Sequence, residues 1–391
     1  MGANDYLPYK HFTKLLVPEK LAKDLAREQE EARERAFADI LKDDDEPEVA
    51  QAPEPSSEAP APKAKKQKRA RLNPGTIQAF DIERTQAEYA RWKKNEKSDQ
   101  GRAKLPHLED ACRLNGEREI PDFGKLLQKP IFKQIRLDFP NMVEAIDQIN
   151  EELVLSAAGR PEDFRFAPIL LNGEPGIGKT ALAMQVADLL GLKMEQLNAS
   201  GLQTGAQIVG TASHWAEASP SMLFKMLAAQ DKAVFVLLID EIDKVSSDGR
   251  FPVLPALLSL LEPQSSRQLK CAATGIEHDL SRLIVMATSN EKKRIDPALL
   301  SRFEVIDVLP PTREQRVVIA ERIHAEIAKQ TRKQIRLDPD SLEKLARSNC
   351  DLRELSRAIR KGFSAALIKG EKSSDPASKL NSSKRTIGFI S

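Results

Sequence analysis

Short apolar runs alternate with longer helical patterns through the middle of the chain. The third and fourth runs are almost continuously apolar, which is typical of central strands in a parallel sheet covered on both faces. The strand candidates are Pro168–Leu171, Leu192–Asn198, Ala233–Asp240, Leu283–Thr288 and Phe303–Leu309. This alternation predicts an α/β domain with a parallel sheet at residues 140–310.

Residues 311–370 show helical patterns without strand candidates, which predicts a small, all-helical domain after the sheet. The first helix carries a capping box, Thr312 with Gln315. The other predicted helices begin at Asp338-Pro339 and at Asp351, and the last one ends at Gly370. The tail at 371–391 is rich in Ser and Lys, and we expect it to be disordered.

The N-terminal part is polar and divides into three stretches. Residues 1–41 predict a charged helical segment, 42–75 a disordered linker rich in Ala, Pro and Glu, and 76–139 a mostly helical region that opens with a polar helix at Thr76–Glu96. A basic cluster at 63–71 can bind nucleic acid or an acidic partner. The alternative interpretation, a solvated linker, is favoured by the composition alone.

The overall composition indicates a soluble, cytoplasmic protein. The 391 residues carry a formal net charge of +2, which creates no general field toward nucleic acid or membranes. Neither a membrane-spanning apolar run nor a secretory signal is evident, so we expect no membrane partner. Cys112, Cys271 and Cys350 are widely spaced and suggest free thiols in a reducing compartment.

A phosphate-binding motif follows the first strand candidate. The stretch is Gly173-Glu174-Pro175-Gly176-Ile177-Gly178-Lys179-Thr180, and a helix leads out from Ala181. Glycines allow main-chain N–H groups to turn inward toward phosphate, Lys179 adds positive charge, and the Thr180 hydroxyl can ligate Mg²⁺. The spacing together with its strand–helix context predicts binding of ATP or GTP with Mg²⁺.

Polar residues at the ends of the next strands complete a hydrolytic site. Asp240 closes the third strand and can hold Mg²⁺, while Glu241 is placed to polarise the water that attacks the γ-phosphate. Asn290, at the end of the fourth strand, can orient that water. An Asn there is also a common turn residue, so its signal is weak by itself.

Two arginines outside the motif have candidate roles toward phosphate. Arg302 precedes the fifth strand and can serve a neighbouring subunit as an arginine finger, although the local sequence alone favours a surface arginine. Arg353, at the start of the third predicted helix of the C-terminal domain, can read the γ-phosphate and couple hydrolysis to lid movement. Arg357, one turn later, competes for that role.

Together these segments resemble the AAA+ ATPases, and among them the ATPase module of Lon proteases, over about residues 140–368. The stretch that begins Leu238-Ile239-Asp240-Glu241 resembles the Lon Walker B segment, and Ala287-Thr288-Ser289-Asn290 resembles its sensor 1. The resemblance implies that Arg302 is an arginine finger, that Arg353 holds the sensor-2 position, and that the protein forms a homo-oligomeric ring of six subunits.

Two features depart from that pattern. Lon proteases continue into a Ser/Lys protease domain, for which too little chain remains after Lys369, so we do not expect proteolysis. Ring translocases carry an aromatic–aliphatic pair in a pore loop, and Trp215 matches the aromatic position. It is followed by Ala216 and Glu217, which give a smaller and more charged loop, and Trp215 packed in the core is the alternative.

Three functions fit these observations. The first is an ATP-hydrolysing ring protein that remodels or unfolds protein substrates, supported by the Lon-like module and Trp215. The second is a nucleic-acid-associated ATPase, a loader or a defence component, that uses the cluster at 63–71. The third is a non-catalytic scaffold, against which the intact Lys179, Asp240 and Glu241 argue.

Overall fold

The computed structural model describes residues 6–8, 16–18, 75–127, 130–202, 204–211, 218–245 and 253–383. Contacts divide the chain into two units, Met1–Arg69 and Ala70–Ser391. In the first unit β1 (Tyr6–Pro8) pairs antiparallel with β2 (Leu16–Pro18). The rest of the predicted segment 1–41 and the linker 42–75, apart from Gly75, lie outside the described residues, as does the basic cluster at 63–71.

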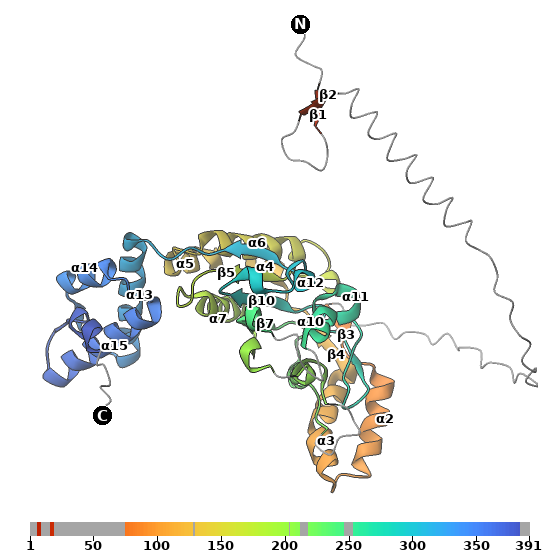
Figure 1. Cartoon of the computed structure of the whole chain (residues 1–391). Coiled ribbons are helices and arrows are strands. Elements are labelled where there is room, and N and C mark those ends of the chain that lie inside the picture. Colours follow the sequence, from red (N-terminus) through yellow and green to blue (C-terminus); the bar gives the residue numbers. More distant parts are fainter. Residues whose placement is uncertain are drawn as a thin grey trace, which may run out of the picture. The chain divides into compact units, whose positions relative to one another are not determined.

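A five-stranded parallel sheet forms the centre of the second unit (Figure 1). Its strands are β5 (Ile169–Asn172), β6 (Met194–Asn198), β7 (Val236–Asp240), β10 (Ile284–Ser289) and β11 (Glu304–Asp307), in the spatial order β11-β5-β10-β7-β6. Every residue of β10 is buried, as the continuous apolar run predicted for a central strand. The α/β prediction is confirmed, with the strands shorter than the apolar runs.

Helices pack around this sheet and share its hydrophobic core. They are α6 (Val143–Ala157), α7 (Lys179–Leu190), α8 (Ala206–Val209), α9 (Met222–Ala228), α10 (Val253–Leu261), α11 (Pro263–Ser266) and α12 (Pro297–Leu300), with a small hairpin of β8 (Leu269–Lys270) and β9 (Glu277–His278). None of the helices in the described part of the chain has both the length and the apolar character that a bilayer crossing requires.

The region before the sheet is built around a helical pair. Its elements are β3 (Thr76–Gln78), α2 (Ile82–Lys93), α3 (Asp99–Cys112), β4 (Glu117–Glu119), α4 (Phe123–Leu127) and α5 (Ile131–Asp138). The helix predicted from Thr76 is wrong over its first residues: Thr76–Gln78 pairs with β4, and the helix starts only after Asp81, whose side chain caps it.

A buried arginine fastens this region to the sheet domain. Arg118 on β4 is fully buried, and its guanidinium donates to five main-chain carbonyls at the ends of α3 and α9 and in the turn between α3 and β4. Arg118 also lies over the Phe80 ring, at 5.1 Å from its centroid. The guanidinium thus links the ends of α3 and α9 to β4 and stabilises the junction.

The C-terminal helical domain has its own small hydrophobic core. Its helices are α13 (Arg313–Thr331), α14 (Pro339–Arg347) and α15 (Leu352–Lys369). The capping box of Thr312 and Gln315 forms as predicted, and Gly370 ends α15 in the left-handed conformation.

The prediction of a disordered tail is wrong for residues 371–383. β13 (Ser373–Ser374) pairs with β12 (Arg336–Leu337), and a short 3-10 helix, Ala377–Ser383, follows. Ser374 is buried, and Pro376 packs so closely on Gly362 of α15 that any side chain there would collide with it. A polar composition did not reveal this packing because it depends on main-chain pairing and one close approach.

Candidate active site

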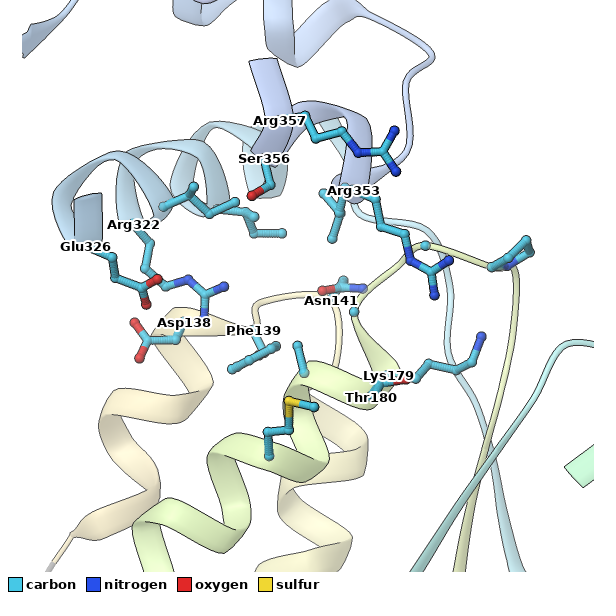
Figure 2. A pocket seen from close by; sticks show the side chains of 18 of the residues that line it. Asp138, Phe139, Asn141, Lys179, Thr180, Arg322, Glu326, Arg353, Ser356 and Arg357 are labelled. Carbon is cyan, nitrogen blue, oxygen red and sulfur yellow. The ribbon is translucent and has the colours of Figure 1, made fainter. Parts of the chain in front are cut away.

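The turn between β5 and α7 carries the predicted phosphate-binding residues 173–180, which we call the P-loop (Figure 2). Gly178 has a φ of +103°, a conformation that side-chain-bearing residues rarely adopt. Gly173 is needed for space, because a Cβ there would lie 2.3 Å from the carbonyl oxygen of Val308. α7 begins at Lys179, so the unpaired N–H groups of its first turn face the loop. The loop and the helix start together form a cradle suited to an anion.

Lys179 crosses this cradle and is buried. Its Nζ donates to the carbonyls of Gly173 and Glu174 at 2.7 and 2.8 Å, and to Oδ1 of Asn290 at 3.3 Å. Burial lowers the pKa of Lys179 to about 8, and the nearby Asp240 carboxylate opposes that shift. The ammonium therefore lies where a phosphate would supply the negative charge that stabilises it.

We expect the affinity for ATP and ADP to fall as the pH rises above about 8. A bound phosphate keeps Lys179 protonated. In the nucleotide-free site Lys179 loses its proton around a pKa of about 8. Binding above that pH takes up a proton, so the dissociation constant increases by about tenfold per pH unit. Calorimetric titrations between pH 7 and 9 measure this effect, with Lys179→Arg as the non-titrating control. A constant affinity in the unmodified protein would contradict the prediction.

Oxygen ligands suited to Mg²⁺ come together at the start of α7 and the end of β7. The Thr180 hydroxyl donates to Oδ1 of Asp240 at 3.2 Å, and Gln196 of β6 donates to the other carboxylate oxygen at 3.0 Å. A hydroxyl and a carboxylate are ligands that Mg²⁺ prefers, with phosphate oxygens completing its shell. No cluster of three or more His, Cys, Asp or Glu side chains placed for a metal occurs in the residues that the structure describes.

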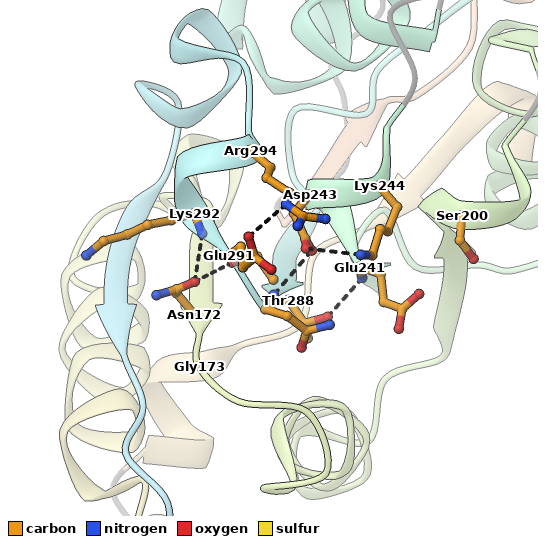
Figure 3. Close-up of polar contacts among 12 residues, drawn as sticks. Asn172, Gly173, Ser200, Glu241, Asp243, Lys244, Thr288, Glu291, Lys292 and Arg294 are labelled. Atoms are coloured by element: carbon orange, nitrogen blue, oxygen red, sulfur yellow. Dashed lines mark hydrogen bonds and ion pairs between the residues drawn. The ribbon is translucent and has the colours of Figure 1, made fainter.

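Glu241 follows Asp240 in an unusual main-chain conformation. Its φ is 56° and ψ 47°, in the left-handed region, at a cost of about 1 kcal/mol for a residue with a side chain. Its N–H donates to the Thr288 hydroxyl at 3.0 Å (Figure 3). Glu241 lines the same cavity as Lys179 and Asp240.

Asn290 is held in place by a buried carboxylate. Its N–H donates to Oδ1 of Asp243 at 3.2 Å, and the Asp243 side chain is fully buried. The Asn290 amide oxygen then reaches Lys179. Residues that are far apart in sequence, at the ends of β5, β7 and β10, therefore meet at one edge of the sheet.

The C-terminal helical domain closes over this edge. The N–H of Leu352 donates to the Gly176 carbonyl at 3.1 Å, and a cavity of about 610 Å³ lies between the two domains. Arg353 and Arg357 both line it. In Figure 2 Arg353 extends toward Lys179, and its charge adds to burial in lowering the pKa of Lys179. The geometry favours Arg353 as the residue that contacts phosphate.

Several residues of this cavity were not predicted from the sequence. Asp138 ends α5, Phe139 and Asn141 lie between α5 and α6, and Arg322 lies on α13 with its guanidinium carbon 4.6 Å from the centroid of the Phe139 ring. Asn141 donates to the Leu309 carbonyl at 3.3 Å, which ties this turn to the end of the sheet domain. No spacing motif marks these residues, because tertiary folding alone brings them beside the P-loop.

Arg302 lies at the opposite edge of the sheet. It precedes β11, whose first residue Glu304 is in register with Ile169, the first residue of β5. The P-loop follows the last residue of β5, about 13 Å farther along the strand. Arg302 is half-exposed and forms an ion pair with Glu262 at 2.7 Å. It is therefore absent from the cavity of its own subunit, and Trp215 lies outside the described residues.

Comparison with known proteins identifies the sheet domain. Residues 169–311 match the model of the ATPase family associated with various cellular activities (AAA). Lon protease of Cytophaga hutchinsonii is 34% identical over 157 residues, which are 40% of this chain and 19% of that protein. Lon protease of Finegoldia magna is 36% identical over 156 residues, 40% and 20% of the two chains. Lon protease homolog 2, peroxisomal, of Arabidopsis thaliana is 34% identical over 160 residues, 41% and 18%.

The chain spans about a fifth of the length of these relatives. A solved structure of a RuvB mutant from Thermotoga maritima has a TM-score of 0.43 and 18% identity, and covers 61% of this chain and 69% of that one. Residues 169–311 thus match the AAA family, and the chain is similar to Lon proteases over about 40% of its length. The family in general uses ATP and a divalent metal ion.

Proposed function

We propose that this chain hydrolyses ATP with Mg²⁺ in a homo-oligomeric ring of six subunits, and that the ring remodels or unfolds protein substrates. The observation that carries the proposal is one cavity that gathers Lys179, the acidic pair Asp240-Glu241, Asn290 and Arg353. A structural role alone does not require a lysine, two carboxylates and an arginine around one enclosed space.

Each side chain has a defined task in this proposal. Lys179 and the loop N–H groups bind the β and γ phosphates, and Arg353 contacts the γ-phosphate from the lid. Thr180 and Asp240 hold Mg²⁺, which when bound supplies positive charge against the phosphate oxygens. Asn290 orients the water that attacks phosphorus while Glu241 accepts its proton, and the bond from the γ-phosphorus to the ADP oxygen breaks.

The nucleobase would lie against the turn that the sequence did not reveal. Phe139 is an aromatic residue that lines the cavity beside the P-loop, and the Asn141 Oδ1 is buried without a hydrogen-bond partner. An amide oxygen of this kind can accept from an exocyclic amine, which adenine has and guanine does not present at the same position. These contacts support ATP as the substrate in preference to GTP.

Unfolded protein is expected to raise the ATPase rate severalfold, and Trp215→Ala to remove that stimulation, because an aromatic side chain in a pore loop would grip the polypeptide. Trp92→Ala is the matched control, since Trp92 is the other of two tryptophans and lies on α2 with the Lys104 ammonium over its ring. Phosphate release is measured with and without a permanently unfolded protein. Equal stimulation in the Trp215→Ala variant and in the unmodified protein would contradict substrate threading.

The relatives that the comparisons identify are proteases, so they do not favour the nucleic-acid alternative. That alternative depends on the basic cluster at 63–71 and predicts salt-sensitive binding of DNA or RNA. Deleting residues 63–71 without loss of such binding would remove its main support.

A further inference from the structure

One threonine lies between the two acidic residues of the site. β10 and β7 run parallel with Ala287 opposite Ile239, so Thr288 stands opposite Asp240, the last residue of β7. Thr288 is 2% exposed and also borders the cavity. In the sequence Thr288 ends a predicted strand and belongs to the stretch that resembles sensor 1, and neither pattern gives it a role of its own.

The Thr288 hydroxyl joins both acids at once. It donates to Oδ1 of Asp240 at 2.5 Å. It also accepts from the N–H of Glu241 at 3.0 Å (Figure 3). An ionised carboxylate can only accept, so the single hydroxyl proton points at Asp240 and the oxygen lone pairs remain for Glu241. The two contacts are thus compatible, and each one orients the other.

The hydrogen bond from the Glu241 N–H to the Thr288 hydroxyl holds Glu241 in an unfavourable main-chain conformation. Glu241 is one of four non-glycine residues with positive φ in the described part of the chain. Strain of this kind persists where the surroundings impose it, and it is concentrated at functional sites. Without the hydroxyl the Glu241 N–H would be left without its partner, and the residue could relax toward the ordinary helical or extended regions. Either change would move the carboxylate.

We propose that Thr288 is a positioning residue for ATP hydrolysis, which through one hydroxyl fixes the Asp240 carboxylate and holds Glu241 in the conformation that directs its side chain into the cavity. The inference rests on the proposed ATPase function. It concerns the hydroxyl alone, since the methyl group of Thr288 could equally be supplied by valine.

The test compares three variants of the full chain. Thr288→Val keeps the shape and removes the hydroxyl, and Thr288→Ser keeps the hydroxyl and removes the methyl group. Thr85→Val is the matched control, because Thr85 on α2 is fully buried, its hydroxyl donates to the Asp81 carbonyl at 2.6 Å, and it lies outside the cavity. For each variant, kcat and KM of ATP hydrolysis, the affinity for ATP without Mg²⁺ and the melting temperature are measured.

Thr288→Val is expected to lower kcat about 10²-fold, the loss that accompanies a misplacement of about 1 Å at a reacting group. Thr288→Ser should stay within about threefold of the unmodified protein, and ATP affinity without Mg²⁺ should hold within about twofold in all variants. A kcat of Thr288→Val equal to that of the unmodified protein would overturn the inference. So would an equal loss in Thr288→Ser, which would assign the effect to packing.

The same assay separates this inference from the function on which it rests. If the unmodified protein hydrolyses no ATP, the proposed function is wrong and the variants have no rate to compare. If it does hydrolyse ATP and Thr288→Val is unimpaired, the function stands and only the role of Thr288 is refuted. A melting temperature lowered to the same extent in Thr85→Val and Thr288→Val, with kcat lost only in the latter, excludes a general loss of stability as the cause.

Discussion

Replacing Glu241 with glutamine is expected to lower the rate of ATP hydrolysis about 10²- to 10⁴-fold while ATP remains bound. The carboxylate is the base that accepts the proton of the attacking water, and general-base catalysis accounts for a loss of this size. The amide has nearly the same shape, so the Glu241 N–H keeps its contact with Thr288 and the cavity keeps its lining. Single-turnover phosphate release and equilibrium binding of ATP measure the two effects separately.

Glu291→Gln is the matched control for this variant. Glu291 lies one residue after Asn290 and pairs with Arg294 at 2.7 Å, with both side chains about half-exposed. Exposed pairs contribute about 0–1 kcal/mol, so its kcat should remain within about twofold of the unmodified protein. Unchanged hydrolysis in Glu241→Gln would overturn the assignment of Glu241 as the base. A trapped ATP-bound protein would also serve to capture the substrate and partner.

The sheet could be predicted because central parallel strands impose a strong constraint on sequence. β7 and β10 are buried from both faces, so each must read as an apolar run that ends where polar residues emerge at the carboxyl edge. The P-loop could also be predicted, because its glycines are required by local main-chain conformations such as the positive φ of Gly178. A structural constraint that acts within one short segment can be recognised from the sequence of that segment alone.

The missed parts depend on contacts between distant segments. Phe139 and Arg322 meet across the cavity although one precedes the sheet and the other follows it, so no window of sequence contains both. Thr76–Gln78 forms a strand because β4 supplies a partner about 40 residues later. Ser374 is polar, yet it is buried through pairing with β12. The hydrophobic pattern and the composition describe each segment separately, so they cannot reveal contacts between distant segments.

Replacing Arg302 with alanine is expected to lower kcat about 10³-fold without changing ATP affinity, because an arginine finger stabilises charge that develops in the transition state. Arg302 lies at the sheet edge opposite its own P-loop, so the nucleotide it serves would belong to a neighbouring subunit. Its ion pair with Glu262 is partly exposed and contributes about 0–1 kcal/mol, so a neighbouring phosphate can compete for the guanidinium. Arg347→Ala, which breaks an exposed pair with Glu343 in the C-terminal domain, is the control.

Mixing two inactive variants tests whether Arg302 acts across a subunit boundary. Arg302→Ala subunits keep Glu241, and Glu241→Gln subunits keep Arg302. A site is therefore complete where an Arg302→Ala subunit provides the P-loop and a neighbouring Glu241→Gln subunit provides the arginine. Random one-to-one mixing of a head-to-tail ring makes about a quarter of its interfaces complete. Hydrolysis should therefore recover to about a quarter of the unmodified rate, whereas each variant alone stays inactive. Absence of any recovery, with mixed assembly verified, would show that Arg302 does not complete the site of a neighbour.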